Sequence, residues 1–268
     1  MKKALKFFCI VGVVGLLICF SNSPSFAQVK VGVMFSMTGP GSPVGKVQLD
    51  GAKLAMKQVN DKGGVMLEGK RVKVEAVIRD DETKPDVAAR RMRELVDENI
   101  KLVVGGTFAH VSQAINVQIR DGQALFMAPN GVEESIFRND TKAPYYISSL
   151  GAVDGIGRMC ADYVSKTYRP NHVVLFLPDY AYGRGAAKGA NKVFSTKYPH
   201  IKITEVWSPV GTPDYTSYII KIKEMKPDVV MMGHWGADAI NALKQVHELG
   251  LKKDAKVFFN SIITAQAV

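Results

Sequence analysis

Two turns that combine glycine with polar residues are the candidate sites for ligand chemistry in this sequence. Gly105–Gly106 follows the apolar run 102–104 and precedes His110, and Asn130–Gly131 follows the apolar run that ends at Ala128. Glycine lets the backbone approach a ligand closely, and the start of a helix offers free N–H groups to an anion. Because ligands bind at the carboxyl ends of neighbouring parallel strands, these two turns predict one binding site.

Residue patterns typical of catalysis or metal binding do not occur in the sequence. His200, His234 and His247 lack the spacing of zinc ligands. The run Gly183–Gly189 departs from the dinucleotide-binding fingerprint, and no Gly-x-Ser-x-Gly segment marks a nucleophilic serine. Cys160 has no suitable histidine as a catalytic partner. We therefore predict a protein that is not an enzyme and that uses no cofactor and no metal.

The first 27 residues have the pattern of a cleaved secretory signal peptide. A basic start precedes the apolar run Phe7–Phe20, which is too short to span a bilayer comfortably, and small residues precede Gln28. Removing the three lysines of this segment lowers the net charge from +10 to +7. The remaining basic residues alternate with acids, as in 90–94, which indicates a solvated helix face rather than a nucleic-acid site.

Cysteine use excludes an internal disulfide in the mature chain. Two of the three cysteines lie in the signal segment, which leaves Cys160 alone. We expect Cys160 to pack on the apolar face of a helix.

Apolar strands alternate with amphipathic helices along the rest of the chain. Strands are predicted at 29–35, 72–78, 102–104, the run ending at Ala128, 172–177, 201–207, 228–232 and 256–259. The helices between them carry apolar residues at helical spacing, at 52–59, 85–96, 110–120, 156–167, 186–194, 215–222 and 239–246. This alternation predicts an α/β fold with parallel sheets and right-handed crossovers.

The α/β pattern breaks after residue 139 and restarts near residue 153. We predict a signal peptide at 1–27, a first lobe at 28–146 and a second lobe at 147–268. A single long doubly wound sheet is the alternative. Two lobes whose strand ends face each other would enclose a cleft, which is a common place for small ligands.

A series of short motifs then makes the prediction more specific. The segment Asn60–Val65, which comes after a long helix, has the pattern Asn-x-x-Gly-Gly-Val. Thr38–Pro40 precedes this segment, and Asp80–Asp81 and Asp214–Tyr215 follow it. Together these motifs resemble the periplasmic substrate-binding proteins of ABC importers, of the branched-chain amino-acid type. The resemblance implies the type I periplasmic-binding-protein fold, in which two lobes, each a parallel sheet flanked by helices, close on a ligand in the cleft between them.

The resemblance also implies which residues contact the ligand. The first lobe would contribute the turns 105–112 and 130–133, and the second lobe its aromatic residues after two strand ends. The candidate ligand-binding residues are Thr38, Ala109, His110, Asn130, Gly131, Tyr182 and Trp235. Tyr180 is a weaker candidate. His234 is also weaker, because it neighbours Trp235 and neighbouring residues at a strand end point in opposite directions.

Two departures from the family pattern affect the expected ligand and the expected length. Family members that bind α-amino acids hold the ligand with hydroxyl residues where this chain has His110, Val132 and Glu133. A different amino acid, an aromatic acid or another organic acid is therefore expected in place of leucine, isoleucine or valine. Family chains normally continue beyond this point, so we expect a C-terminally truncated chain that exposes apolar surface on its first lobe.

These observations predict a periplasmic solute-binding component of an ABC transporter. It would capture a small amino acid or related organic acid in the cleft, act as a monomer and deliver the ligand to an inner-membrane permease, without binding nucleic acid. The alternative is a ligand-sensing extracellular module of a receptor system, which would normally continue into a transmembrane helix. An exported α/β enzyme is a third class, but it requires a nucleophile or a metal set.

Overall fold

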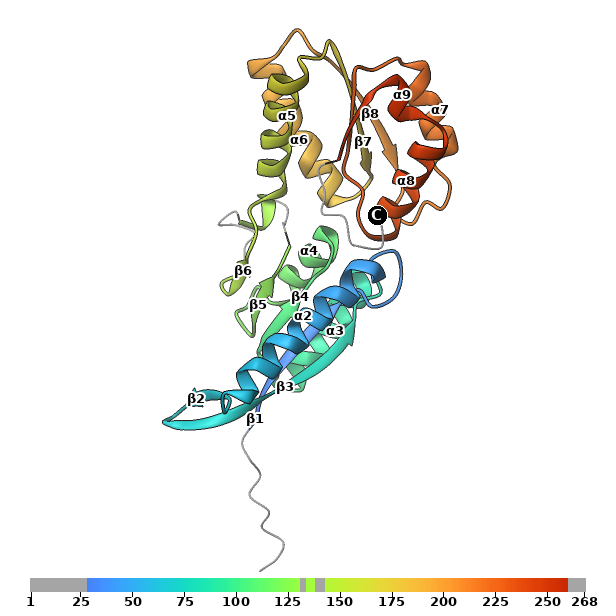
Figure 1. Cartoon of the computed structure of the whole chain (residues 1–268). Helices are drawn as coiled ribbons and strands as arrows, with labels where there is room; N and C mark the ends of the chain where they lie inside the picture. Colours follow the sequence, from blue (N-terminus) through green and yellow to red (C-terminus); the bar gives the residue numbers. More distant parts are fainter. Residues whose placement is uncertain (1–27, 131–133, 138–142, 260–268) are drawn as a thin grey trace, which may run out of the picture. The chain divides into compact units, whose positions relative to one another are not determined.

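The computed structural model describes residues 28–130, 134–137 and 143–259 (Figure 1). The contacts among these residues form two compact units. The smaller unit holds residues 28–29 and 56–75, and the larger unit holds the rest of the described chain. The larger unit contains every described candidate site residue.

The smaller unit is built on an antiparallel pair of strands. β2 (Val65–Leu67) pairs with the first residues of β3 (Lys70–Asp80). From the second half of α2 (Ser42–Asp61), the Asn60 side chain donates to the Val74 carbonyl and accepts from the Val74 amide, both at 2.8 Å. The sequence analysis missed β2, because three residues at a turn carry no periodic signal.

The first sheet has six strands in the order β2-β3-β1-β4-β5-β6. β1, β4, β5 and β6 pair in parallel. Their bounds are β1 (Gln28–Phe35), β4 (Leu102–Gly105), β5 (Leu125–Ala128) and β6 (Tyr146–Ser148), and the connecting helices are α3 (Pro85–Asp97), α4 (Ala109–Gln118) and the 3-10 turn η1 (Glu134–Phe137). The short strand β6 was not predicted.

Apolar residues at helical spacing pack α3 and α4 against one face of this sheet. Pro85 lies in the first turn of α3, where an N–H group would have no helical partner. Met92 and Leu95 of α3 are fully buried. They join Ile115 of α4 and Phe126 of β5 in one core cluster.

The other face of the first sheet is covered only in part by the described residues. The strand register places Val33, Val104, Met127 and Ile147 in one row. Val33 is 1% exposed, whereas Met127 and Ile147 are 41% and 48% exposed. Because parallel sheets are normally covered on both faces, this row is an exposed apolar surface of the kind that the sequence analysis expected.

The second sheet has four parallel strands in the order β10-β9-β7-β8. The strands are β7 (His172–Pro178), β8 (Lys202–Ser208), β9 (Val229–Met232) and β10 (Lys256–Phe259). The helices are α5 (Val153–Tyr168), α6 (Ala181–Lys197), α7 (Thr216–Glu224), α8 (Gly236–Glu248) and the short α9 (Leu251–Asp254), which was not predicted.

Helices cover both faces of the second sheet (Figure 1). α5 and α6 bury one side of β7, including Leu175, and α7, α8 and α9 bury the other side, including Phe176. Strands buried on both faces have nearly continuous apolar sequences, which explains why this strand was predicted well. Cys160 of α5 is 7% exposed in the first of these clusters, as expected.

Two glycines bring α5 and α6 into direct backbone contact. A Cβ atom added at Gly157 would lie 2.1 Å from the Ala186 carbonyl oxygen. A Cβ atom added at Gly189 would lie 1.9 Å from the Asp154 carbonyl oxygen. Each helix therefore approaches the other through a position that admits no side chain.

The α/β class with two sheets flanked by helices confirms the predicted fold class. The predicted lobe boundary at residue 146 stays a prediction; β6 ends at Ser148 and α5 begins at Val153. Within the described ranges, none of the helices has both the length and the apolar character needed to cross a membrane.

Candidate functional site

Three helices begin at aromatic residues that follow strand ends. Phe108 precedes α4 after β4, Tyr180 precedes α6 after β7, and Trp235 precedes α8 after β9. None of the three helix starts has a side-chain hydrogen bond to cap it. Helix starts normally carry Ser, Thr, Asp or Asn, whose side chains cap the first N–H groups. At these three starts an aromatic side chain takes the place of the cap and packs against other rings.

The side chains around these starts form one aromatic cluster that joins the two sheets. Its members are Phe108 and His110 from the first sheet, and Tyr180, Tyr182 and Trp235 from the second. Tyr180 lies 5.4 Å from Phe108 and 4.9 Å from His110, measured between ring centroids. It lies 6.0 Å from Tyr182, which is in turn 5.9 Å from Trp235. The predicted residues His110, Tyr182 and Trp235 are thus brought together.

Buried polar atoms without a partner among the described residues occur in and beside this cluster. They include His110 Nδ1, Trp235 Nε1 and Gln48 Oε1. A buried polar atom that makes no hydrogen bond costs about 1–3 kcal/mol, and a bound ligand can remove that cost. Gln48 was missed by the sequence analysis, because a glutamine within a helix has no distinguishing pattern.

His110 is neutral and presents a lone pair. Its Nε2 lies 3.2 Å from the Thr83 carbonyl oxygen, which can only accept, so Nε2 carries the proton. Burial lowers the pKa of His110, and the hydrogen bond to Thr83 opposes this only in part. Nδ1 is therefore an acceptor, and the expectation that His110 serves an anion does not follow for this protonation state.

Asn130 lies at the end of β5, but its side chain holds the first sheet together. Its amide oxygen accepts from Gln48 Nε2 at 2.8 Å, and its amide nitrogen donates to the Thr107 carbonyl. Its own carbonyl accepts from the Ser148 hydroxyl at 3.0 Å. The described contacts give Asn130 a positioning role beside the cluster.

The remaining predicted residues are placed as follows. Thr38 is exposed and its hydroxyl donates to Asp80 Oδ2 at 2.7 Å. Ala109 is 4% exposed and packs in one cluster with Tyr182 of the second sheet. Gly131 lies outside the described residues, as do Val132 and Glu133.

Two weaker candidates had opposite outcomes. Tyr180 lies in the middle of the aromatic cluster, although the sequence favoured Tyr182 over it. His234 is fully buried beneath the site, where its Nε2 lies 3.0 Å from the Ser208 hydroxyl. Burial lowers the pKa of His234 to about 3, so this histidine is a neutral core residue.

A second contact between the sheets uses main-chain atoms. The Ala237 amide at the start of α8 donates to the Pro40 carbonyl at 3.0 Å. Gly236 has φ +60°, and a Cβ atom added there would lie 2.5 Å from the same oxygen. We call this contact the Pro40 latch.

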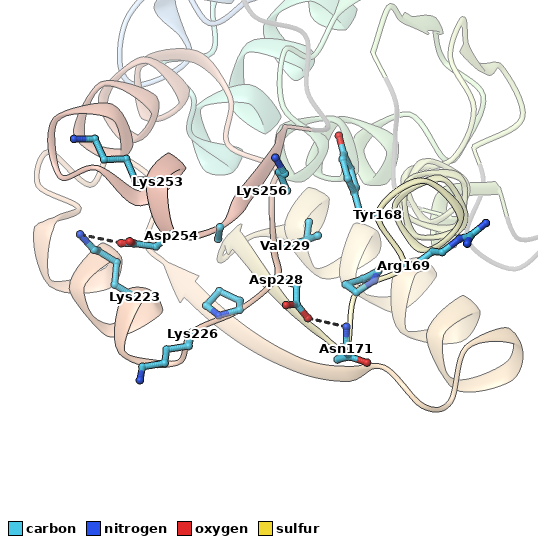
Figure 2. A pocket seen from close by; sticks show the side chains of 13 residues that line it. Tyr168, Arg169, Asn171, Lys223, Lys226, Asp228, Val229, Lys253, Asp254 and Lys256 are labelled. Atoms are coloured by element: carbon cyan, nitrogen blue, oxygen red, sulfur yellow. Dashed lines mark hydrogen bonds and ion pairs between the residues drawn. The ribbon is translucent and has the colours of Figure 1, made fainter.

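A separate cavity of about 760 Å³ lies at the amino ends of β7, β9 and β10, opposite the strand ends that carry the aromatic cluster (Figure 2). Its basic residues are Arg169, Lys223, Lys226, Lys253 and Lys256. Lys223 pairs with Asp254 at 3.1 Å, and Asp228 accepts from the Asn171 amide at 2.7 Å. α5, α7 and α9 end here, and the carboxyl end of a helix carries a partial negative charge. These helix ends stabilise the basic side chains around the cavity.

Metal chemistry finds no support in the described ranges. No group of three or more His, Cys, Asp or Glu side chains there could hold a metal ion.

Asp81 is a buried carboxyl group below the start of α2. Its Oδ1 accepts from the Ser36 hydroxyl and the Thr83 amide, and its Oδ2 has no partner among the described residues. Burial raises the pKa of Asp81 to about 6, although these two hydrogen bonds oppose the shift.

We expect Asp81→Asn to remove part of the pH dependence of stability. A raised carboxyl pKa stabilises the folded state below the unfolded value of about 4, and this contribution is lost as the pH rises through 6. Asparagine keeps the acceptor atom but has no charge to bury. The free energy of unfolding of the variant, relative to the wild type, should increase by about 2 kcal/mol between pH 4 and pH 7.

Urea unfolding at several pH values measures this difference. Asp50→Asn, on an exposed position of α2, removes the same charge without burial and serves as the control. A difference between Asp81→Asn and wild type that stays constant with pH would contradict the burial of a titrating carboxyl at this position.

The sequence profile of the periplasmic binding protein family matches residues 28–268. The chain belongs to the periplasmic binding protein family. This match confirms the family predicted from the motifs, and the family is one of solute-binding proteins.

Relatives and solved structures agree with this assignment. The Leu/Ile/Val-binding protein BraC3 of Rhizobium johnstonii is 25% identical over 226 residues, which cover 83% of this chain and 59% of that protein. The leucine-specific-binding protein of Salmonella typhimurium is 24% identical over 252 residues, which cover 94% of this chain and 66% of that protein. A solute-binding protein of an ABC transporter from R. palustris, solved with benzoate, matches with a TM-score of 0.77 at 22% identity, over 87% of this chain and 62% of that one.

The periplasmic binding protein thus has the fold of longer relatives. The chain spans 59% and 66% of the two relatives described above. The solved structure shares the fold at a low identity, so its benzoate site is a property of that protein.

Proposed function

We propose that this periplasmic binding protein captures a small amino acid or related organic acid between its two sheets for import by an ABC transporter. The observation that supports this most is the aromatic cluster at the strand ends, with the unpartnered atoms His110 Nδ1 and Trp235 Nε1. Family members close around their ligands by hinge motion, and we propose that the Pro40 latch is one of the contacts made on closing.

The finer parts of the proposal follow from the family and the sequence. Residues 1–27 act as a cleaved signal peptide that directs the chain to the periplasm. The protein acts there as a monomer, passes its ligand to an inner-membrane permease and carries out no chemical reaction. The permease acts by favouring one closure state over the other.

Thermal unfolding of residues 28–268 against a panel of amino acids, aromatic acids and aliphatic acids tests the proposal. A ligand that binds only the folded state adds about 2.7 kcal/mol of stability at a hundredfold excess over its Kd. We expect one class of compound in the panel to raise the melting temperature. His110→Ala and Trp235→Ala should each reduce that shift.

Two results would oppose the proposal. One is a cooperative transition that no compound in the panel moves. The other is chemical conversion of a bound compound, detected by chromatography of the mixture. A solute receptor releases its ligand unchanged, so conversion would indicate an enzyme.

A further inference from the structure

The amino ends of the second sheet carry a concentration of positive charge. Its four strands run in parallel, so the connections that lead into them all lie at one edge of the sheet. Counted from the last turn of each helix to the first residue of the next strand, these connections are 165–172, 194–202, 221–229 and 251–256. They contain ten basic and three acidic residues, a net charge of +7, which equals the net charge of residues 28–268. We call these connections the basic edge.

The opposite edge of the same sheet is acidic. The described connections that leave the strands, from the last strand residue to the first turn of the next helix, are 178–184, 208–219 and 232–239. They contain three aspartates and one arginine, and that arginine, Arg184, pairs with Asp179 at 2.6 Å. The sheet is therefore polar along its strands, and an anionic surface would attract its basic edge.

Few of the cations at the basic edge are neutralised. Asp162 of α5 pairs with Lys166 at 2.6 Å and with Lys197 at 3.3 Å. Lys223 pairs with Asp254 at 3.1 Å. The other seven basic residues are exposed and have no ion pair among the described residues. The carboxyl ends of the four helices carry at most about half a negative charge each, so the edge keeps about four positive charges after these ends and Asp162 are included.

Two of the unpaired cations occupy positions that suit glycine. Arg169 follows α5 with φ +47°, and Lys226 follows α7 with φ +48°. A left-handed residue at the end of a helix is usually glycine, because a Cβ atom is strained there. The local backbone therefore does not account for a basic side chain at either position.

The arrangement of the cations fits an extended surface better than a small anion. Strands lie about 4.8 Å apart, so the edge is about 15 Å wide. Figure 2 shows Arg169, Lys226 and Lys253 pointing away from one another around the cavity, not converging on it. Nine of the ten basic residues are lysines, which lack the planar fork that lets arginine recognise a single carboxylate. Many separate point charges are typical of contact with a charged surface.

We propose that the basic edge binds reversibly to the anionic lipid headgroups of the inner membrane. The proposal rests on the proposed function, which places the chain between that membrane and its permease. Tyr168 is 39% exposed among the cations, and a tyrosine ring suits the boundary between headgroups and water. The contact would keep the receptor close to its permease. It would also leave the aromatic cluster uncovered, because the cluster lies at the opposite ends of the strands.

Sedimentation with lipid vesicles measures this contact. Residues 28–268 are used, because the apolar run in the first 27 residues would itself bind lipid. One set of vesicles contains equal parts of phosphatidylglycerol and phosphatidylcholine, and the other contains phosphatidylcholine alone. We expect binding to the anionic vesicles only. The affinity should fall at least tenfold as the salt rises from about 0.01 M to about 0.15 M, because the screening length falls from about 30 Å to about 8 Å.

A triple variant removes charge from the basic edge. Lys221, Lys252 and Lys253 are exposed and have no ion pair among the described residues. Each lysine near an anionic membrane contributes about fivefold to the affinity. Changing all three to Gln should therefore weaken binding to the anionic vesicles at least tenfold, while a ligand from the panel should shift the melting temperature as it does in the wild type.

A second triple variant provides a control with the same net charge. Lys30 of β1, Lys53 of α2 and Lys101 before β4 are also exposed and have no ion pair among the described residues. Changing these three to Gln should leave vesicle binding within twofold of the wild type at low salt, because the basic edge keeps all its cations.

A pair of glycine substitutions tests the edge without a risk to folding. Arg169→Gly with Lys226→Gly removes two cations at positions where glycine suits the backbone. The double variant should keep the melting temperature of the wild type or exceed it, and should bind anionic vesicles at least fivefold more weakly.

The outcomes separate this inference from the proposed function. Absence of binding to anionic vesicles at low salt, or equal weakening by the two triple variants, overturns the inference. Competition by glycerol phosphate overturns it as well, because it would indicate a site for one free anion. None of these results affects the melting-temperature test with the ligand panel. Vesicle binding by a chain that responds to no compound in the panel would support the basic edge and contradict solute capture alone.

Discussion

Gly189→Ala is expected to lower the melting temperature of this protein by about 10 °C. The new methyl carbon would lie 1.9 Å from the Asp154 carbonyl oxygen, and both atoms are fixed by helix backbones. α5 and α6 must move apart, which disturbs the core around Cys160, Val164 and Phe194. Overpacking of a core costs about 1–3 kcal/mol and sometimes more, and we expect the upper end here because no flexible side chain can yield.

A second glycine within a helix provides the control. Gly51 in α2 has no atom within 4 Å of an added Cβ. Gly51→Ala should stabilise the protein by about 0.5–1 kcal/mol through helix propensity alone. If Gly189→Ala behaves like Gly51→Ala in thermal unfolding, the two helices do not approach each other as described.

Gly236→Ala is expected to break the Pro40 latch and to weaken ligand binding by at least tenfold. An added Cβ would lie 2.5 Å from the Pro40 carbonyl oxygen, so the Ala237 amide would lose its acceptor. We expect the latch to form only when the two sheets close on a ligand, so the variant should lose a hydrogen bond of that arrangement. In the proposed function a ligand binds between the sheets, so its affinity should fall with the population of the closed arrangement.

Backbone strain alone must be separated from this effect, because Gly236 has φ +60°. Gly250 has φ +69°, and its nearest neighbour is 3.8 Å from an added Cβ. Gly250→Ala therefore has the same left-handed strain without the collision, and should lower the melting temperature while leaving the Kd unchanged. Titration of both variants with the ligand found in the panel decides the point; a Kd of Gly236→Ala equal to that of Gly250→Ala would rule out the latch.

Much of the fold could be predicted because buried parallel strands have a strong sequence signal. The run 172–177 is apolar throughout, and it forms β7 at His172–Pro178. β2 and β6 were missed because each has three residues, too few to show a period of two. β2 pairs with β3 directly after it, and β6 pairs with β5, so their positions depend on pairing between strands, which the pattern within one short segment does not contain.

The sequence could nominate residues that the structure brings together, but it could not predict their individual contacts. The alternation at a strand end distinguishes His234 from Trp235, and the structure places His234 in the core and Trp235 against the aromatic cluster. The sequence ranked Tyr180 below Tyr182, but the Tyr180 ring contacts Phe108 and His110, which come from a different part of the chain. The protonation of His110 depends on the Thr83 carbonyl from another loop, and no spacing rule could predict that partner.

The Pro40 latch joins a main-chain carbonyl to a main-chain amide, whereas the ligand contacts proposed for the aromatic cluster come from side chains. Most substitutions change side chains but leave main-chain groups in place; Gly236 is an exception, because an added Cβ meets the Pro40 carbonyl oxygen. During divergence, the family could therefore exchange residues such as those at 110 and 235 to accept a new nutrient while inheriting the same closing contact. Ligand specificity would then change faster in evolution than the main-chain contact that holds the two sheets together.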